Sequence, residues 1–252
     1  MSNNLPKSML TQVTRAITHF SLIQPGDKVV VGVSGGKDSN SLLFCLNMYR
    51  QRYLRKIPFQ LHAVHLDMGL GAEIEPLKDY CRRLDIPLTV KATDIGAILF
   101  DIRKESNPCA LCANLRRGAL HNTALELGYN KVALAHHLDD VLETFLMSLL
   151  YNGNMKTFSP KTYLDRARLT LIRPFVYVTE SQILQLLPQK NIPVIHNPCP
   201  ANKKTKREEI KKLVNDLSFQ YPDVRQKFLT ALHNFDPKNL WPAKENQKGR
   251  WG

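Results

Sequence analysis

The stretch KVVVGVSGGKDSNSLL, residues 28–43, decides the fold. A continuous β-branched run leads into Ser-Gly-Gly and then into an apolar-periodic segment, which is typical of a buried strand, a tight turn and a helix. The turn is too short for G-x-x-x-x-G-K-[ST] and has no G-x-G-x-x-G. Ser34, Gly35 and Gly36 still allow close backbone approach to a ligand, and the positive end of the next helix faces the same point. We expect the loop to hold phosphate or pyrophosphate rather than to be a plain capped turn.

The same alternation continues along the chain. Strand-like runs at residues 59–69, 86–94 and 130–137 are separated by helical patterns, and residues 169–178 have the pattern of a fifth strand. This order predicts an α/β fold with a doubly wound, mostly parallel sheet covered by helices on both faces. Polar clusters follow three of the strands, at 34–39, 67–71 and 136–140. Because ligands bind at the carboxyl ends of such strands, these clusters are expected to form one site.

Composition and charge suggest how the chain is organised. We expect an N-terminal helix (residues 1–25), a nucleotide-binding catalytic domain (26–180) and a helical, basic C-terminal segment (181–252) that contains a third site cysteine. The net charge of +13 and pI of about 9.6 favour a polyanionic partner such as nucleic acid. No apolar run is long enough for a membrane span, and no signal peptide is visible, so we expect a cytoplasmic protein. One basic group opens the C-terminal segment: Lys203, Lys204, Lys206 and Arg207.

The cysteine spacing suggests a metal or redox site. Cys109 and Cys112 form a CxxC that is expected just before a helix, and Cys199 lies far away in "HNPCP". A redox dithiol, a zinc site and an iron–sulfur site all use CxxC. With His196 as a fourth ligand, spacing alone does not separate a Cys3His zinc site from a three-cysteine cluster.

Two parts of the sequence resemble a known family. "SGGKDS" between a buried strand and a helix resembles the PP-loop of ATP pyrophosphatases, which release pyrophosphate when they adenylate a substrate oxygen. Together with the CxxC and Cys199, "CALCANLRRGALHNTALELGYNKVALAHHLDDVLETFLMSLLYNGNMK" is similar to the TtcA/TtuA group of tRNA thiolases, and most to its 2-thiocytidine-forming TtcA branch. The similarity covers about residues 28–199. The chain departs from TtcA at "PCP", where many members have PC-x-x-C, and it lacks the cysteine knuckles usual in TtuA.

The resemblance implies an ATP-dependent tRNA sulfurtransferase. It would adenylate the C2 oxygen of an anticodon-loop cytidine and transfer sulfur by way of a [4Fe-4S] cluster. The alternatives are thiolation of another tRNA base, as in 2-thiouridine formation, and a non-catalytic nucleotide- and metal-binding RNA regulator. The implied cofactors are the cluster, ATP and Mg²⁺. The implied partners are tRNA, a sulfur donor (cysteine desulfurase or inorganic sulfide) and a second copy in a homodimer, with no membrane.

The resemblance also assigns roles to individual residues. The cluster ligands would be Cys109, Cys112 and Cys199, and the catalytic residues Asp140, Arg116 and Asp38. Asp140 would act either through the magnesium of ATP or by deprotonating the substrate, whereas Asp139 could simply cap the next helix. The nucleotide would contact Gly32, Val33, Ser34, Gly35, Gly36, Lys37, Asp38, Ser39, Leu66, Asp67, Ala135 and Asp140.

Overall fold

A six-stranded sheet forms the centre of the structure. The structure is a computed structural model that describes residues 7–103, 108–195, 198–199 and 206–234, with 236, 238 and 240. Within them the strand order is β3-β2-β1-β4-β6-β5, and only β5 runs antiparallel to its neighbour. This confirms the predicted doubly wound, mostly parallel sheet. The strands are β1 Lys28–Gly32, β2 Gln60–Asp67, β3 Leu88–Ala92, β4 Lys131–Ala133, β5 Lys161–Leu164 and β6 Leu169–Ile172.

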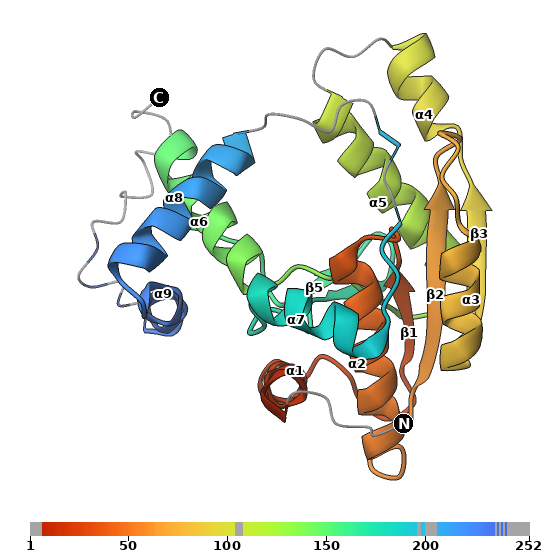
Figure 1. The fold of residues 1–252 in the computed structure, drawn as a ribbon, viewed down its shortest axis with the longest axis horizontal. Helices are drawn as coiled ribbons and strands as arrows, with labels where there is room; N and C mark the ends of the chain where they lie inside the picture. Colours follow the sequence, from red (N-terminus) through yellow and green to blue (C-terminus); the bar gives the residue numbers. More distant parts are fainter. Residues whose placement is uncertain are drawn as a thin grey trace.

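Helices cover both faces of this sheet. In β1, Val29 and Val31 point into the larger core with α2, whereas Val30 points to the other face and packs with Leu120 of α5. Figure 1 shows α8 and α9 beside α6, away from the strands. The helices are α1 Lys7–His19, α2 Lys37–Tyr53, α3 Glu75–Leu84, α4 Ile95–Ala97, the π-helical turn η1 Ile98–Ile102, α5 Pro108–Glu126, α6 Leu138–Asn152, α7 Glu180–Lys190, α8 Lys206–Gln220 and α9 Val224–His233.

One apolar core holds the helices of the larger face together. It includes Met9 of α1, Cys45 of α2, Cys81 of α3 and Val214 of α8, all buried. The division into three parts therefore stays a prediction, since a single core joins residues from each. Of the helices that the structure describes, none has both the length and the apolar character needed to cross a membrane.

Two local predictions were wrong. The expected strand at residues 169–178 ends at Ile172, and the chain then makes a buried turn closed by Val178 N–H donating to Phe175 O. The CxxC does not precede a helix but lies in the first turns of α5, because Pro108 starts the helix. Proline suits a first helical position, where its missing N–H costs no hydrogen bond. The antiparallel edge strand β5 was not predicted.

Candidate active site

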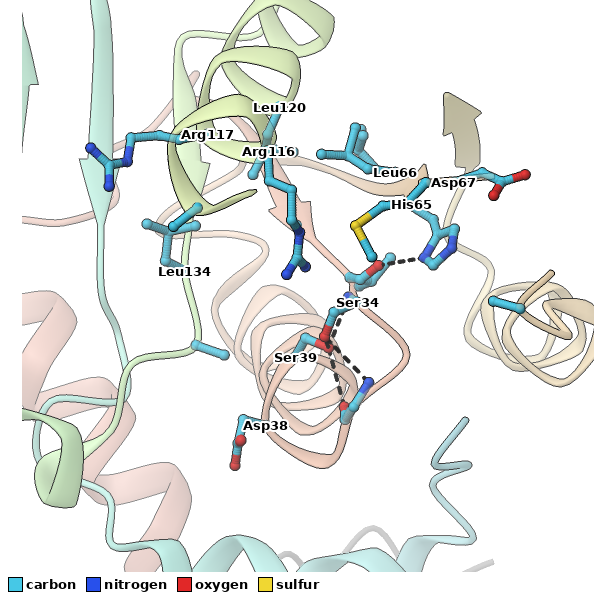
Figure 2. Close-up of a pocket in the computed structure, with 18 of the residues that line it drawn as sticks. Ser34, Asp38, Ser39, His65, Leu66, Asp67, Arg116, Arg117, Leu120 and Leu134 are labelled. Atoms are coloured by element: carbon cyan, nitrogen blue, oxygen red, sulfur yellow. Dashed lines mark hydrogen bonds between the residues drawn. The ribbon is translucent and has the colours of Figure 1, made fainter. Parts of the chain in front are cut away.

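The loops that follow β1 and β4 line the same cavity. These two strands are neighbours, and the strand order reverses between them, with β2 and β3 on one side and β6 and β5 on the other. Connections leave such a point in opposite directions, which opens a crevice at the carboxyl ends of the strands. A cavity of about 520 Å³ lies there, walled also by α5 (Figure 2). Its position agrees with the convergence expected for the polar clusters.

Most of the predicted site residues line this cavity. They are Gly32, Val33, Ser34, Gly36, Asp38, Ser39, Leu66, Asp67, Arg116, Ala135 and Asp140. Gly35 and Lys37 belong to the same loop but do not line the cavity, and neither do the three cysteines. The clusters at 67–71 and 136–140 supply Met68 and His136 to the wall as expected, but the sequence reasoning missed His65 and His121 and the apolar Leu120 and Ile195. Single apolar and histidine side chains carry no pattern that separates a pocket wall from a core.

Hydrogen bonds within the loop after β1 close it on itself. Ser34 N–H donates to Ser39 Oγ at 3.1 Å, and the two hydroxyl oxygens lie 3.2 Å apart. Gly36 N–H donates to Ser34 Oγ at 3.3 Å, and Ser39 Oγ donates to Gly36 O at 3.1 Å. Figure 2 shows Ser39 in the first turn of α2 and Ser34 next to it, both below Arg116. The loop is therefore a compact turn with two hydroxyls facing the cavity.

A distant segment is attached to the same loop. Ile195 N–H donates to Gly35 O at 2.9 Å, and Asn40 Nδ2 donates to Gly35 O and to Pro193 O, at 3.2 and 2.8 Å. Gly35 has φ +81°, and an added Cβ would lie 3.0 Å from the Ile195 side chain. Glycine is needed here on both counts. The attachment brings Pro198 to the cavity wall, one residue before Cys199.

Lys37 is held by two carboxylates. Its Nζ lies 2.8 Å from Asp38 Oδ1 and 3.0 Å from Glu180 Oε1. Burial alone would lower the pKa of the Lys37 amino group, but these carboxylates outweigh burial and raise it. Lys37 was expected to contact the nucleotide, and here its amino group binds side chains from α2 and α7.

The two aspartates that follow β4 have different surroundings. Asp139 is buried, and it accepts from Arg225 Nε and from Glu180 N–H, each at 2.7 Å. Asp140 lines the cavity and accepts from His137 N–H at 3.0 Å, while its own N–H donates to His137 Nδ1 at 3.4 Å. The N-cap of α6 is therefore His137, and Asp139 instead joins α6 to α7 and α9. Asp140 is the aspartate available to a ligand.

The side chains that follow the CxxC connect it to the cavity. Figure 2 shows Arg116 pointing toward Ser34 and Ser39, whereas Arg117 extends the other way. Burial raises the pKa of the Cys112 thiol, the Arg116 guanidinium opposes this rise, and the thiols of Cys199 and Cys109 add to it. Cys199 therefore lies within electrostatic reach of Cys112, although the two are far apart in the sequence.

The structure gathers the three thiols without closing a metal site. In the described part of the chain, no three His, Cys, Asp or Glu side chains lie close enough together to hold a metal ion. His196, the expected fourth zinc ligand, lies outside the described residues. Three cysteines in one neighbourhood are nevertheless the donors that an iron–sulfur cluster takes. The residues present fit such a group, and the ligand set stays a prediction.

Known proteins share both the sequence and the fold. Residues 9–217 match the PP-loop domain family. A tRNA-cytidine(32) 2-sulfurtransferase from Pelobacter propionicus is 40% identical over 90% of this chain and 86% of its own. One from Syntrophotalea carbinolica is 39% identical over 91% and 89%. The U34-tRNA thiolase NcsA from Methanococcus maripaludis, solved with its [4Fe-4S] cluster, has a TM-score of 0.73 over 91% of this chain and 79% of that one. At 23% identity, it shows a shared fold.

Proposed function

The chain belongs to the PP-loop family, and from this membership we propose that it is an ATP-dependent tRNA sulfurtransferase that forms 2-thiocytidine in the anticodon loop. One observation carries the proposal: the loop after β1, Asp140 and Arg116 of the cysteine-bearing helix line a single cavity. The relatives named tRNA-cytidine(32) 2-sulfurtransferase support cytidine as the substrate base.

The cavity suits adenylation of a base. The C2 oxygen of the cytidine attacks the α-phosphate of ATP, and pyrophosphate leaves. The hydroxyls of Ser34 and Ser39 and the N-terminus of α2 face the departing pyrophosphate. The Arg116 guanidinium stabilises negative charge that develops on the phosphates, and Asp140 is placed to accept the proton that the amino group of the cationic, O2-adenylated cytosine would lose. Mg²⁺ bound to ATP would offset the charge of the triphosphate.

Sulfur delivery involves the cysteines around the N-terminus of α5. Cys109, Cys112 and Cys199 would hold a [4Fe-4S] cluster, which supplies the sulfur that replaces the activated oxygen when AMP leaves. The Arg116 guanidinium interacts with the Cys112 thiol and points toward Ser34 and Ser39. It is therefore placed to contribute both to adenylation and to sulfur transfer. Cys109 is exposed, which would give a sulfur donor access from solvent.

The partners follow from charge and from family. A net charge of +13 favours binding to the tRNA backbone and predicts that this binding weakens as salt rises. We place the reaction in the cytoplasm, where tRNA is modified. A homodimer, and a cysteine desulfurase or inorganic sulfide as sulfur donor, belong to the same proposal on the family resemblance alone.

The test is reconstitution with purified components. Protein loaded with iron and sulfide under anaerobic conditions is mixed with ATP, sulfide and unmodified tRNA, and the digested nucleosides are analysed by mass spectrometry. We expect 2-thiocytidine together with AMP and pyrophosphate. Detection of a thiolated uridine instead would show that the protein acts on another base. Binding of ATP and tRNA with no thiolated base would favour the regulator.

A cysteine variant separates the two half-reactions. Cys199→Ser should lose bound iron and 2-thiocytidine while it still releases pyrophosphate. Cys81→Ala is the matched control, since it removes a thiol that lies in the apolar core, and it should retain iron and thiolation. Retained iron and thiolation in Cys199→Ser would remove Cys199 from the site.

A further inference from the structure

Two half-buried basic residues of α8 lie on the side of the helix that packs against the rest of the molecule. Arg207, Ile210, Lys211 and Val214 are spaced three and four residues apart, so they lie on one face of the helix. Ile210 and Val214 are buried in the main core. Arg207 and Lys211 therefore belong to the face by which α8 packs on its neighbours, whereas Lys212 on the same helix is exposed.

Arg207 contacts three residues of α6 that lie within about one turn of that helix, Asp140, Glu143 and Thr144. Its Nη1 lies 3.4 Å from Asp140 Oδ1, and its Nε lies 3.5 Å from Glu143 Oε2. Its Nη2 donates to Thr144 Oγ1 at 3.1 Å. Arg207 belongs to the basic group that opens the C-terminal segment, and the positive charge of the chain favours a nucleic-acid partner, but in the structure its guanidinium binds α6 next to the cavity.

These contacts matter because α6 places two acids together. Asp140 and Glu143 are three residues apart on one helix face, and Glu143 is buried with only 4% of its surface exposed. Burial, and then the charge of Asp140, raise the pKa of Glu143 to about 7, while Arg207 and Lys211 oppose that rise. Without a cation near both, the two carboxylates would repel each other, and among the described residues only His137 would hold the Asp140 carboxylate in place.

We propose that Arg207 is a positioning residue for the adenylation step: it holds the Asp140 carboxylate toward the cavity and compensates the charge of Glu143. The inference rests on the proposed function. It makes adenylation depend on the docking of α8, a helix that belongs to the basic C-terminal segment. The neighbouring Lys211 binds Glu180, which in turn binds Lys37 of the phosphate loop, so α8 supports both loops of the site.

The test compares three substitutions on α8. Arg207→Gln should lower the rate of tRNA-dependent AMP formation about 10- to 100-fold, with the Kd for ATP nearly unchanged, because the misplaced group acts after binding. Arg207→Lys should recover part of the rate, since it restores the charge but not the fork of donors. Lys212→Gln removes the same charge from the exposed face and should leave the rate within about twofold of wild type.

A second substitution distinguishes positioning from simple structural support. The double variant Arg207→Gln/Glu143→Gln also lacks the Glu143 carboxylate that would repel Asp140. Its rate of AMP formation should therefore rise well above that of Arg207→Gln alone. A merely structural role predicts instead that the second substitution adds to the damage, seen as a further fall in Tm. An unchanged or lower rate in the double variant would overturn the inference.

The remaining outcomes separate this inference from its premise. If wild-type protein forms no AMP with tRNA, the proposed function fails. If wild type is active and Arg207→Gln behaves like Lys212→Gln, only the positioning role fails. If Arg207→Gln instead weakens tRNA binding and flattens its salt dependence with turnover unchanged, Arg207 is an RNA contact and the inference is wrong.

Discussion

The two loops of the site are stabilised in different ways. The loop after β1, residues 32–39, is closed mainly by hydrogen bonds among its own residues, such as that from Ser34 N–H to Ser39 Oγ. The loop after β4, residues 134–140, is held mainly by residues from the last third of the chain. Arg207 of α8 contacts Asp140, and Arg225 of α9 contacts Asp139. The first loop is therefore specified largely by its own residues, with residues 193–195 and Glu180 bound to it, whereas the second combines a local His137–Asp140 cap with contacts from the C-terminal helices.

This difference has a consequence for dynamics. A loop held by short-range hydrogen bonds persists as long as its strand and helix persist. A loop held by docked helices loosens whenever those helices open, and such local opening requires less free energy than global unfolding. We therefore expect the loop after β1 to keep its conformation throughout the folded state, and the position of Asp140 to depend on whether α8 is docked.

The largest effects should come from the two adjacent aspartates, with opposite results. Asp140→Asn should reduce AMP formation about 10²- to 10⁴-fold, since it removes the group that we propose accepts a proton, and should leave Tm almost unchanged. Asp139→Asn should lower the free energy of unfolding by about 3 kcal/mol, because it breaks a largely buried pair with Arg225. Steady-state assays of AMP formation and thermal unfolding should be measured for both variants, to show that one loses activity and the other loses stability.

Each aspartate serves as the control for the other, since the two changes are chemically identical and one residue apart. Asp139→Asn protein that remains folded at low temperature should retain much of its turnover. A large loss of stability in Asp140→Asn, or a normal Tm in Asp139→Asn, would contradict the division of roles described above.

The same contrast explains what the sequence could and could not predict. Ser34, Gly35 and Gly36 show their role locally, because their residue types and order specify a tight turn before a helix. Nothing near Arg207 indicates that it binds an acid 67 residues away, and a basic group is normally read as an RNA contact. The edge strand β5 was missed for a related reason: four residues with alternating exposure look like a loop until β6 pairs with them.

An intermediate effect is expected from Gly35→Ala in the locally specified loop. The substitution adds a Cβ to a residue with φ +81° and places it against the Ile195 side chain. We expect this strain to lower the free energy of unfolding by about 1–3 kcal/mol. Because the strain falls on the phosphate cradle, the Kd for ATP should rise about tenfold, as measured by isothermal titration calorimetry. Gly26→Ala is the matched control, since Gly26 has φ +85° with no atom near its added Cβ and lies outside the cavity.

Gly26→Ala should lose stability but bind ATP normally. If both variants weaken ATP binding equally, the effect is general destabilisation, and the loop has no special role. If Gly35→Ala binds ATP as tightly as wild type, the cradle for pyrophosphate lies elsewhere.

The smallest effect concerns pH, and it should appear only in the loop after β4. Burial lowers the pKa of His136 to about 4, against the favourable charge of Asp140 and with further lowering by Arg173, Arg207 and His137. The unfolded chain binds this proton near its usual pKa of about 6.5, so acidification favours the unfolded state. From pH 7.5 to 5.5, His136 should contribute a loss of about 1 kcal/mol in the free energy of unfolding.

His136→Phe isolates this contribution. The new ring can pack against Phe158 as the imidazole does, in a tilted contact with a centroid distance of 4.9 Å, but it does not titrate. Glu143, whose raised pKa of about 7 makes stability fall as pH rises, remains in both proteins and largely cancels in the difference. Urea unfolding should show the variant gaining stability over wild type as pH falls. A parallel pair of curves would mean that His136 takes up its proton in the folded protein as easily as in the unfolded chain, which would contradict the lowered pKa.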